Sequence, residues 1–245
     1  MVTRLPLFPL GTVLVPGEVL PLHIFEPRYR QLVDDLIQAG QQDERMTFGV
    51  IAIRAGLEVG RDRLHALHGI GCVAEVLEVR RHADGSSEVE SVGRERFRLI
   101  DLDADAGTPY LTGLVEIIDE PVVAVAPELV ARVQAGFDTY TRRLTAVVNA
   151  STMRGEQPGD APDDTAHDEP DEQSRLLRDD PTVLSYLVTA TMLLHLGERQ
   201  KLLASPDAGS RLRAALQLLR REITLLEVLP SVPAIDLAQL PADPR

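Results

Sequence analysis

Short apolar runs bounded by glycine, proline or aspartate fill the first half of the chain, a pattern that predicts β-strands. The runs cover residues 12–15, 19–25, 47–53, 71–81, 87–102 and 110–118. Five prolines in the first 33 residues indicate a sheet that turns sharp corners, because each proline removes a donor from the hydrogen-bond ladder. Asp84 and Gly85 predict a tight hairpin between the two longest runs, since glycine tolerates the positive φ of such turns.

The longest run changes phase along its length. Val92 lies on its even-numbered face, whereas Phe97 and Leu99 lie on its odd-numbered face. Because successive side chains of a strand point to opposite faces, one extra residue must shift the pattern between them. We therefore predict a β-bulge near Gly93, which bends the strand and favours a closed or strongly coiled sheet.

Helical spacing dominates the second half of the chain. Apolar residues recur every three or four positions over residues 129–147 and again over 212–226. Asp180 followed by Pro181 is typical of an N-cap and a first helical residue, and predicts a helix that ends near residue 196. Gly197 interrupts this helix, and a short helix follows before Ser205 and Pro206 start the last one.

One earlier helix is predicted from Pro27 to Gly40. Strands first and helices second indicate an α+β protein. We expect a β-rich subdomain over residues 1–120, a helical-bundle subdomain over 121–230 and a tail over 231–245. An insertion at about 151–180 is rich in Pro, Gly, Asp and Glu without apolar periodicity, so it is predicted to be flexible.

Acidic residues are concentrated in that insertion. Residues 156–180 hold ten acidic and two basic side chains, which account for most of the net charge of −13. The remainder is only mildly acidic, so neither part has the net basic charge of a nucleic-acid surface, although a local cluster of arginines stays open. The charge therefore argues against a nucleic-acid partner. The longest apolar-rich stretch, residues 183–196, is shorter than the roughly 20 residues that span a bilayer, so no membrane partner is expected. A single cysteine and an N-terminus without a signal peptide predict a cytoplasmic protein.

Few side chains point to chemistry. His65 and His68 have no acidic partner at a fixed spacing, so we expect loop histidines and no metal site. Cys72 lies in a predicted strand and is interpreted as a small buried residue. Lys201 is the only lysine, and its expected role is a solvated surface charge. We therefore expect no catalytic residue, no metal ligand and no cofactor.

Three segments are informative together. They read "LPLFPLGTVLVPGEVLPLHIFEPRY" at the start, "GIGCVAEVLEV" followed by "DGSSEVESVGRERFRL" in the middle, and "LLHLGERQKLLASPDAGSRLRAALQLLRREITLLE" near the end. In this order they resemble the N-terminal substrate-binding domain of the Lon protease family, over most of the chain except the insertion and the tail. The resemblance implies a PUA-like pseudo-β-barrel followed by a helical bundle.

The same resemblance implies a protein that binds polypeptide. In full-length Lon this domain precedes an ATPase and a serine–lysine peptidase. The chain has no G-x-x-x-x-G-K-[ST] motif, and Lys201 lies in a short amphipathic segment. We therefore expect a free-standing substrate-binding domain without peptidase or ATPase activity, which takes unfolded or tagged protein segments and works with a protease or chaperone. The sequence leaves the oligomeric state open.

Two other functions stay open at this point. A pocket of the barrel near His23 and Arg94 could hold a compact ligand, as in a small-molecule or nucleotide-related sensor or enzyme. A purely structural role in a larger complex is the other. His23 itself is expected to be a hydrogen-bonded residue of the barrel rather than a catalyst.

Eight residues are candidates for peptide contacts, because tyrosine and arginine commonly anchor protein interfaces. Structural roles compete with this interpretation, and we favour them for two residues: Glu26 would cap the helix and Arg28 would pair locally. One face of a predicted strand carries Arg94, Arg96 and Arg98. These arginines would bind acidic partners or simply form the solvent-exposed face of the strand. The candidates are Phe8, His23, Phe25, Glu26, Arg28, Tyr29, Arg94 and Phe97.

Overall fold

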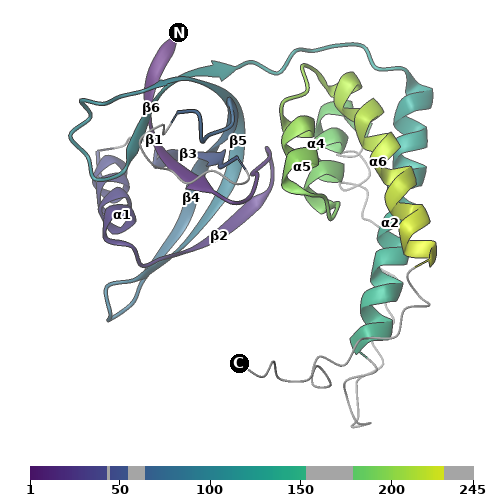
Figure 1. The fold of residues 1–245 in the computed structure, drawn as a ribbon, viewed down its shortest axis with the longest axis horizontal. Helices are drawn as coiled ribbons and strands as arrows, with labels where there is room; N and C mark the ends of the chain where they lie inside the picture. The colour runs from purple at the N-terminus through teal and green to yellow at the C-terminus, as the bar shows by residue number, and fades with distance from the viewer. Residues whose placement is uncertain (43–44, 55–63, 153–178, 229–245) are drawn as a thin grey trace, which may run out of the picture.

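The computed structural model describes residues 1–42, 45–54, 64–152 and 179–228. Its first part is a six-stranded sheet in the order β2-β5-β4-β3-β1-β6, and a further pairing of β5 with β6 closes the sheet into a barrel (Figure 1). Only β1 and β3 pair in parallel. The strands are β1 (Val2–Leu10), β2 (Val19–Ile24), β3 (Thr47–Ala52), β4 (Ile70–Arg81), β5 (Ser87–Leu102) and β6 (Leu111–Ile118).

Strand β5 carries the predicted bulge. Ala74 of β4 pairs with Gly93, whereas Cys72, two residues earlier, pairs with Arg96, three residues later. The extra residue of β5 moves the following side chains to the other face, which explains the phase change in the sequence. Gly93 is required here, since a Cβ atom would lie 2.1 Å from the carbonyl oxygen of Val15. The predicted hairpin is also confirmed, with Gly85 at φ +80°.

The strand predicted at residues 12–15 is wrong, because β1 lies earlier and includes two prolines. Pro6 lies where β1 pairs only with β6, and Pro9 lies where it pairs only with β3. Each proline therefore has an unpaired side on which a missing N–H breaks no ladder bond. Val13 and Val15 are apolar because they pack against the helices, and not because they belong to the sheet.

Five helices accompany the sheet in the described residues. Helix α1 buries Tyr29, Leu32, Val33 and Leu36 in the main barrel core. Helices α4 and α5 lie next to the barrel, and α2 and α6 lie on their far side (Figure 1). The five helices are α1 (Pro27–Gly40), α2 (Pro127–Thr152), α4 (Pro181–Thr191), α5 (Leu196–Leu203) and α6 (Ala208–Val228).

Helix α4 begins as predicted and ends early. The Asp180 carboxylate accepts hydrogen bonds from the backbone N–H groups of Thr182 and Val183, at 2.7 and 3.2 Å. The helix ends at Thr191, and Met192 turns to an extended conformation with its side chain in the helical core. The break predicted at Gly197 therefore comes before α5, which includes Gly197 in its first turn.

The mixed α/β architecture, with strands before helices, is confirmed, whereas the PUA-like type of barrel and the bundle description stay predictions. The strands end at Ile118 and α2 begins at Pro127, and the division into subdomains stays a prediction. Most of the acidic insertion and the whole predicted tail lie outside the described residues. Within the described part, no helix combines the length and the apolar character needed to cross a bilayer.

Candidate functional site

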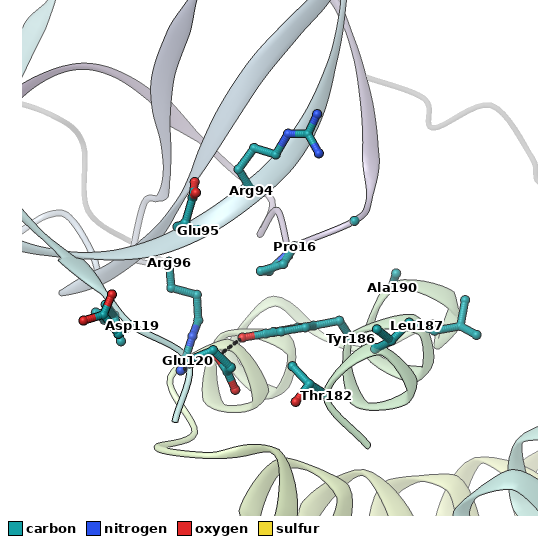
Figure 2. A pocket seen from close by; sticks show the side chains of 13 residues that line it. Pro16, Arg94, Glu95, Arg96, Asp119, Glu120, Thr182, Tyr186, Leu187 and Ala190 are labelled. Atoms are coloured by element: carbon teal, nitrogen blue, oxygen red, sulfur yellow. Dashed lines mark hydrogen bonds and ion pairs between the residues drawn. The ribbon is translucent and has the colours of Figure 1, made fainter. Parts of the chain in front are cut away.

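A cleft of about 730 Å³ lies where the barrel meets helix α4. One wall is formed by β5 and the loop before β2, and the other by α4, while the segment after β6 lies at one side (Figure 2). Its volume falls within the roughly 300–1,000 Å³ typical of ligand pockets. The lining residues are Pro16, Gly17, Arg94, Glu95, Arg96, Ile118, Asp119, Glu120, Thr182, Val183, Tyr186, Leu187 and Ala190.

Helix α4 is apolar on two faces. Leu184 and Val188 are fully buried in the core that α4 shares with α2 and α6. On the other face, Val183 and Leu187 line the cleft and keep 38% and 36% of their surface exposed. A helix that is apolar all round is normally covered on all sides. The cleft face of α4 is therefore apolar surface that the described chain leaves uncovered.

Glu120 joins the barrel to the helices at the floor of the cleft. Its Oε2 accepts hydrogen bonds from Arg96 Nη2 at 2.8 Å and from the Tyr186 hydroxyl at 2.6 Å, the latter drawn in Figure 2. Its Oε1 accepts a hydrogen bond from Arg211 Nη2 at 3.0 Å. Because Arg96 belongs to β5, Tyr186 to α4 and Arg211 to α6, one carboxylate connects three elements.

The two arginines are buried, and the N–H groups that do not bind Glu120 include donors to carbonyl groups at the end of α5. Arg96 and Arg211 are 3% and 0% exposed. Arg96 Nη1 donates to the carbonyl oxygens of Leu203 and Ser205, and Arg211 Nε donates to that of Leu202. The C-terminus of a helix has unpaired carbonyls and a partial negative charge, so it stabilises buried guanidinium groups.

Tyr186 is held in a fixed position by its neighbours. The Arg211 guanidinium carbon lies 3.9 Å from its ring centroid, and its hydroxyl donates a hydrogen bond to Glu120. Burial raises the pKa of Tyr186, and the hydrogen bond to Glu120 raises it further, so the phenol stays protonated at neutral pH. Burial lowers the pKa of Arg211, which its neighbours Tyr186 and Glu120 partly offset. The cluster is therefore suited to holding geometry rather than to transferring protons.

A second set of contacts joins α5 to the barrel. Arg199 Nε donates to the carbonyl oxygen of Val13 at 2.9 Å, and its Nη2 is hydrogen-bonded to Glu18. Gln200 Nε2 donates to the carbonyl oxygen of Ile70, also at 2.9 Å. Together with the Glu120 cluster, these bonds fix the walls of the cleft relative to each other, which makes the cleft preformed.

Three of the eight candidate residues lie in the barrel interior. Phe8 stacks on Tyr29 with ring centroids 4.0 Å apart, and both residues are less than 10% exposed. Phe97 is fully buried in a neighbouring cluster. These side chains pack the core in this structure, and peptide contacts by them stay a prediction.

Four other candidates lie at the junction of β2 and α1 and do not line the cleft. Phe25 is 60% exposed, with its ring centroid 6.0 Å from that of the exposed His23. The local pairing of Arg28 is confirmed, since its Nη2 lies 2.8 Å from Glu26 Oε2. Glu26 occupies the N-cap position, but the predicted side-chain cap is wrong because Arg28 engages its carboxylate instead. The His23 side chain has no hydrogen bond to the described residues, contrary to our expectation.

Arg94 is the only one of the eight candidates that lines the cleft. Its Nε donates to Glu75 at 2.5 Å. The predicted common face of Arg94, Arg96 and Arg98 is wrong, because the bulge separates Arg94 from Arg96, and Figure 2 shows them pointing in different directions. Arg98 is exposed. Arg96 is buried and contacts the helices, so it does not belong to a solvent-exposed face.

Sequence reasoning missed the residues that shape the cleft. Glu120, Tyr186 and Leu187 were not singled out, although one signal was present. The apolar residues of α4 occupy more than one face of the helix, which a helix packed on one side does not need. Nothing in the sequence pairs Glu120 with arginines 24 positions before it and 91 positions after it.

Four further side chains with reactive groups do not line the cleft. Cys72 is fully buried, and burial raises the pKa of its thiol, which lowers its reactivity. Lys201 is exposed in the last turn of α5, as expected of a surface charge. His65 and His68 lie outside the strands and helices. Within the described ranges, no three His, Cys, Asp or Glu residues are grouped so that they could hold a metal ion.

Comparison with known proteins gives a consistent result. The family model of the ATP-dependent protease La (LON) substrate-binding domain matches residues 4–221. Lon protease 1 of Thermus thermophilus is 28% identical over 229 residues, which cover 92% of this chain and 25% of that protein. Lon protease 2 of Herpetosiphon aurantiacus is 29% identical over 226 residues, with coverages of 92% and 24%. This chain thus spans about a quarter of the length of the curated relatives it matches.

Two solved structures share the fold. A Lon N-terminal domain protein from Xanthomonas campestris superposes with a TM-score of 0.58 at 23% identity, and the N-terminal domain of Mycobacterium avium complex Lon protease with a TM-score of 0.57 at 20% identity. Both matches cover 89% of this chain and 98% of the other chain. At these identities the likeness concerns the fold alone.

Proposed function

The chain belongs to the LON substrate-binding domain family, and on that premise we propose that it binds segments of unfolded or tagged polypeptide. The cleft between β5 and α4 is the proposed binding site. An extended segment directs alternate side chains to opposite sides, so it would contact the apolar face of α4 while its backbone runs along the cleft.

The observation that carries this proposal is the uncovered apolar face of α4. Val183, Leu187 and Ala190 line the cleft together with Pro16 and Ile118, and partly buried hydrogen bonds hold its walls. Apolar surface removed from water stabilises a complex by roughly 25 cal/mol per Å². A preformed cleft also lowers the entropic cost of binding, because the walls need not be ordered when the segment arrives.

We propose binding without peptidase or ATPase activity. Nucleophilic catalysis requires a nucleophile next to a base. The residues that line the cleft in the described structure include no serine, cysteine, histidine or lysine. The Thr182 hydroxyl has no hydrogen bond to a base among the described residues, and the one phenol is protonated and hydrogen-bonded to Glu120. Incubation of an unfolded protein with the chain should therefore leave its intact mass unchanged.

A fluorescence anisotropy titration tests the proposal. The full chain is added to a labelled protein that has been permanently unfolded, and to the same protein in its folded state. We expect saturable binding of the unfolded form only. Leu187→Ser should weaken that binding roughly three- to tenfold, because it removes apolar contact area from the cleft.

Leu225→Ser is the matched control, since Leu225 is 47% exposed on α6 and does not line the cleft. It should leave the affinity unchanged. Equal effects of the two substitutions, or no binding of the unfolded protein, would show that the proposal is wrong. A saturable thermal shift with a small metabolite and no polypeptide binding would favour the ligand-sensor alternative instead.

The proposed partner is a protease or chaperone that receives the bound segment in the cytoplasm. The net charge of −13 offers no support for a nucleic-acid partner. Affinity capture from the native cytoplasm, with Leu187→Ser as the reference bait, would identify partners that depend on an occupied cleft.

A further inference from the structure

We propose that the cleft prefers apolar segments in which a lysine or arginine lies next to the apolar residues. The inference rests on the proposed function and names the class of polypeptide that the same cleft takes. It comes from the charges on the cleft walls and from the way in which those charges are paired.

Three carboxylates and two guanidinium groups line the cleft. Arg94 is hydrogen-bonded to Glu75, and Arg96 to Glu120, so neither guanidinium lacks a counter-charge. The side chains of Glu95 and Asp119 are exposed, and their carboxylates have no hydrogen bond or ion pair with the described residues. Figure 2 shows both carboxylates pointing away from α4, so the uncompensated negative charge lies at the edge of the cleft.

The floor of the cleft carries charge of the opposite sign, but it is less accessible. Arg96 and Arg211 share one carboxylate, that of Glu120, which leaves an excess positive charge. Both arginines are at most 3% exposed and donate to carbonyl groups at the end of α5. One donor, Arg96 Nε, is buried without an acceptor. A ligand reaches the exposed carboxylates without displacing these bonds.

The geometry of α4 limits the length of the segment. The α4 residues that line the cleft lie between positions 182 and 190, and at 1.5 Å per residue they span roughly 12 Å. An extended chain covers that distance with about four residues at 3.3 Å each. A lysine or arginine at an end of such a segment can lay its aliphatic stem along the cleft while its charge reaches a carboxylate at the edge.

The test uses the full chain and three labelled peptides of equal length with the same apolar residues, flanked by arginine, serine or glutamate. Anisotropy titrations at low ionic strength should rank the affinities as arginine, then serine, then glutamate, with about a three- to tenfold difference between the extremes. The difference should disappear near 1 M salt, where the screening length falls to about 3 Å, while apolar binding persists.

Variants locate the effect. Glu95→Gln combined with Asp119→Asn should remove the preference for the arginine peptide and leave the affinity for the serine peptide unchanged. Glu90→Gln combined with Asp105→Asn is the matched control, because both residues are exposed carboxylates that do not line the cleft. The control should keep the full preference.

The outcomes separate this inference from the proposed function. Equal binding of all three peptides would overturn the inference and leave the proposed function standing. Tighter binding of the glutamate peptide would overturn it as well, and would assign the recognition to the buried excess charge of Arg96 and Arg211. If no peptide binds at all, both the proposed function and this inference are wrong.

Discussion

At the scale of single residues, Glu120 determines how the barrel and the helices are held together. Its carboxylate accepts hydrogen bonds from two buried arginines and one tyrosine, and each of these three residues belongs to a different element. A buried charge that loses its partner is strongly destabilising, more so than the intact pair is stabilising. The stability of the junction therefore depends strongly on one side chain that lines the cleft.

Glu120→Gln should lower the free energy of unfolding by about 3 kcal/mol, since it leaves Arg96 and Arg211 without a counter-charge. The value lies at the low end for buried pairs because the Glu120 side chain is 24% exposed. Urea denaturation measures the change. Glu116→Gln, at a partly exposed carboxylate of β6 with no ion pair among the described residues, should change stability by less than about 0.5 kcal/mol. Equal losses in the two variants would contradict this role of Glu120.

At the scale of elements, helix α4 links stability to the cleft. One face of α4 is buried against α2 and α6, and the other forms a cleft wall. Its first turn, which includes Thr182 and Val183, depends on the cap formed by Asp180. Loosening that turn should therefore disturb the cleft as well as the helix.

Asp180→Ala should cost about 1 kcal/mol of stability, because two backbone N–H groups lose their acceptor. It should also weaken binding of an unfolded polypeptide, since two cleft residues lie in the frayed turn. Asp180→Asn is the control, because asparagine caps helices about as well as aspartate. If the alanine and asparagine variants are equally stable by urea denaturation, the cap does not hold the first turn.

Local patterns in the sequence predicted most of the strands and helices. Contacts between residues far apart in the sequence could not be predicted from it. The bulge near Gly93 followed from a change of phase that any sheet must resolve by an extra residue. Val13 and Val15 were assigned to a strand because an apolar run does not distinguish burial in a sheet from burial under a helix. For the same reason the burial of Arg96 was not predicted, because the alternation of the strand placed this residue on a face that contacts solvent or a partner.

At the scale of the whole molecule, the barrel and the helices are tied together on both sides of an uncovered apolar surface. Glu120 links β5 to α4 and α6, while Arg199 and Gln200 link α5 to the loop before β2 and to β4. Such an arrangement keeps apolar side chains accessible without collapse of the cleft. This is the physical basis of the proposed polypeptide binding.

A fluorophore in the cleft tests that claim most directly. Because Cys72 is fully buried, Thr182→Cys can be labelled selectively at the cleft, and Thr224→Cys, at an exposed threonine of α6, provides the control. On titration with an unfolded polypeptide, we expect a saturable blue shift from the label at position 182 and no change at 224. A silent label at position 182, with binding detected by anisotropy, would place the polypeptide elsewhere and contradict the account.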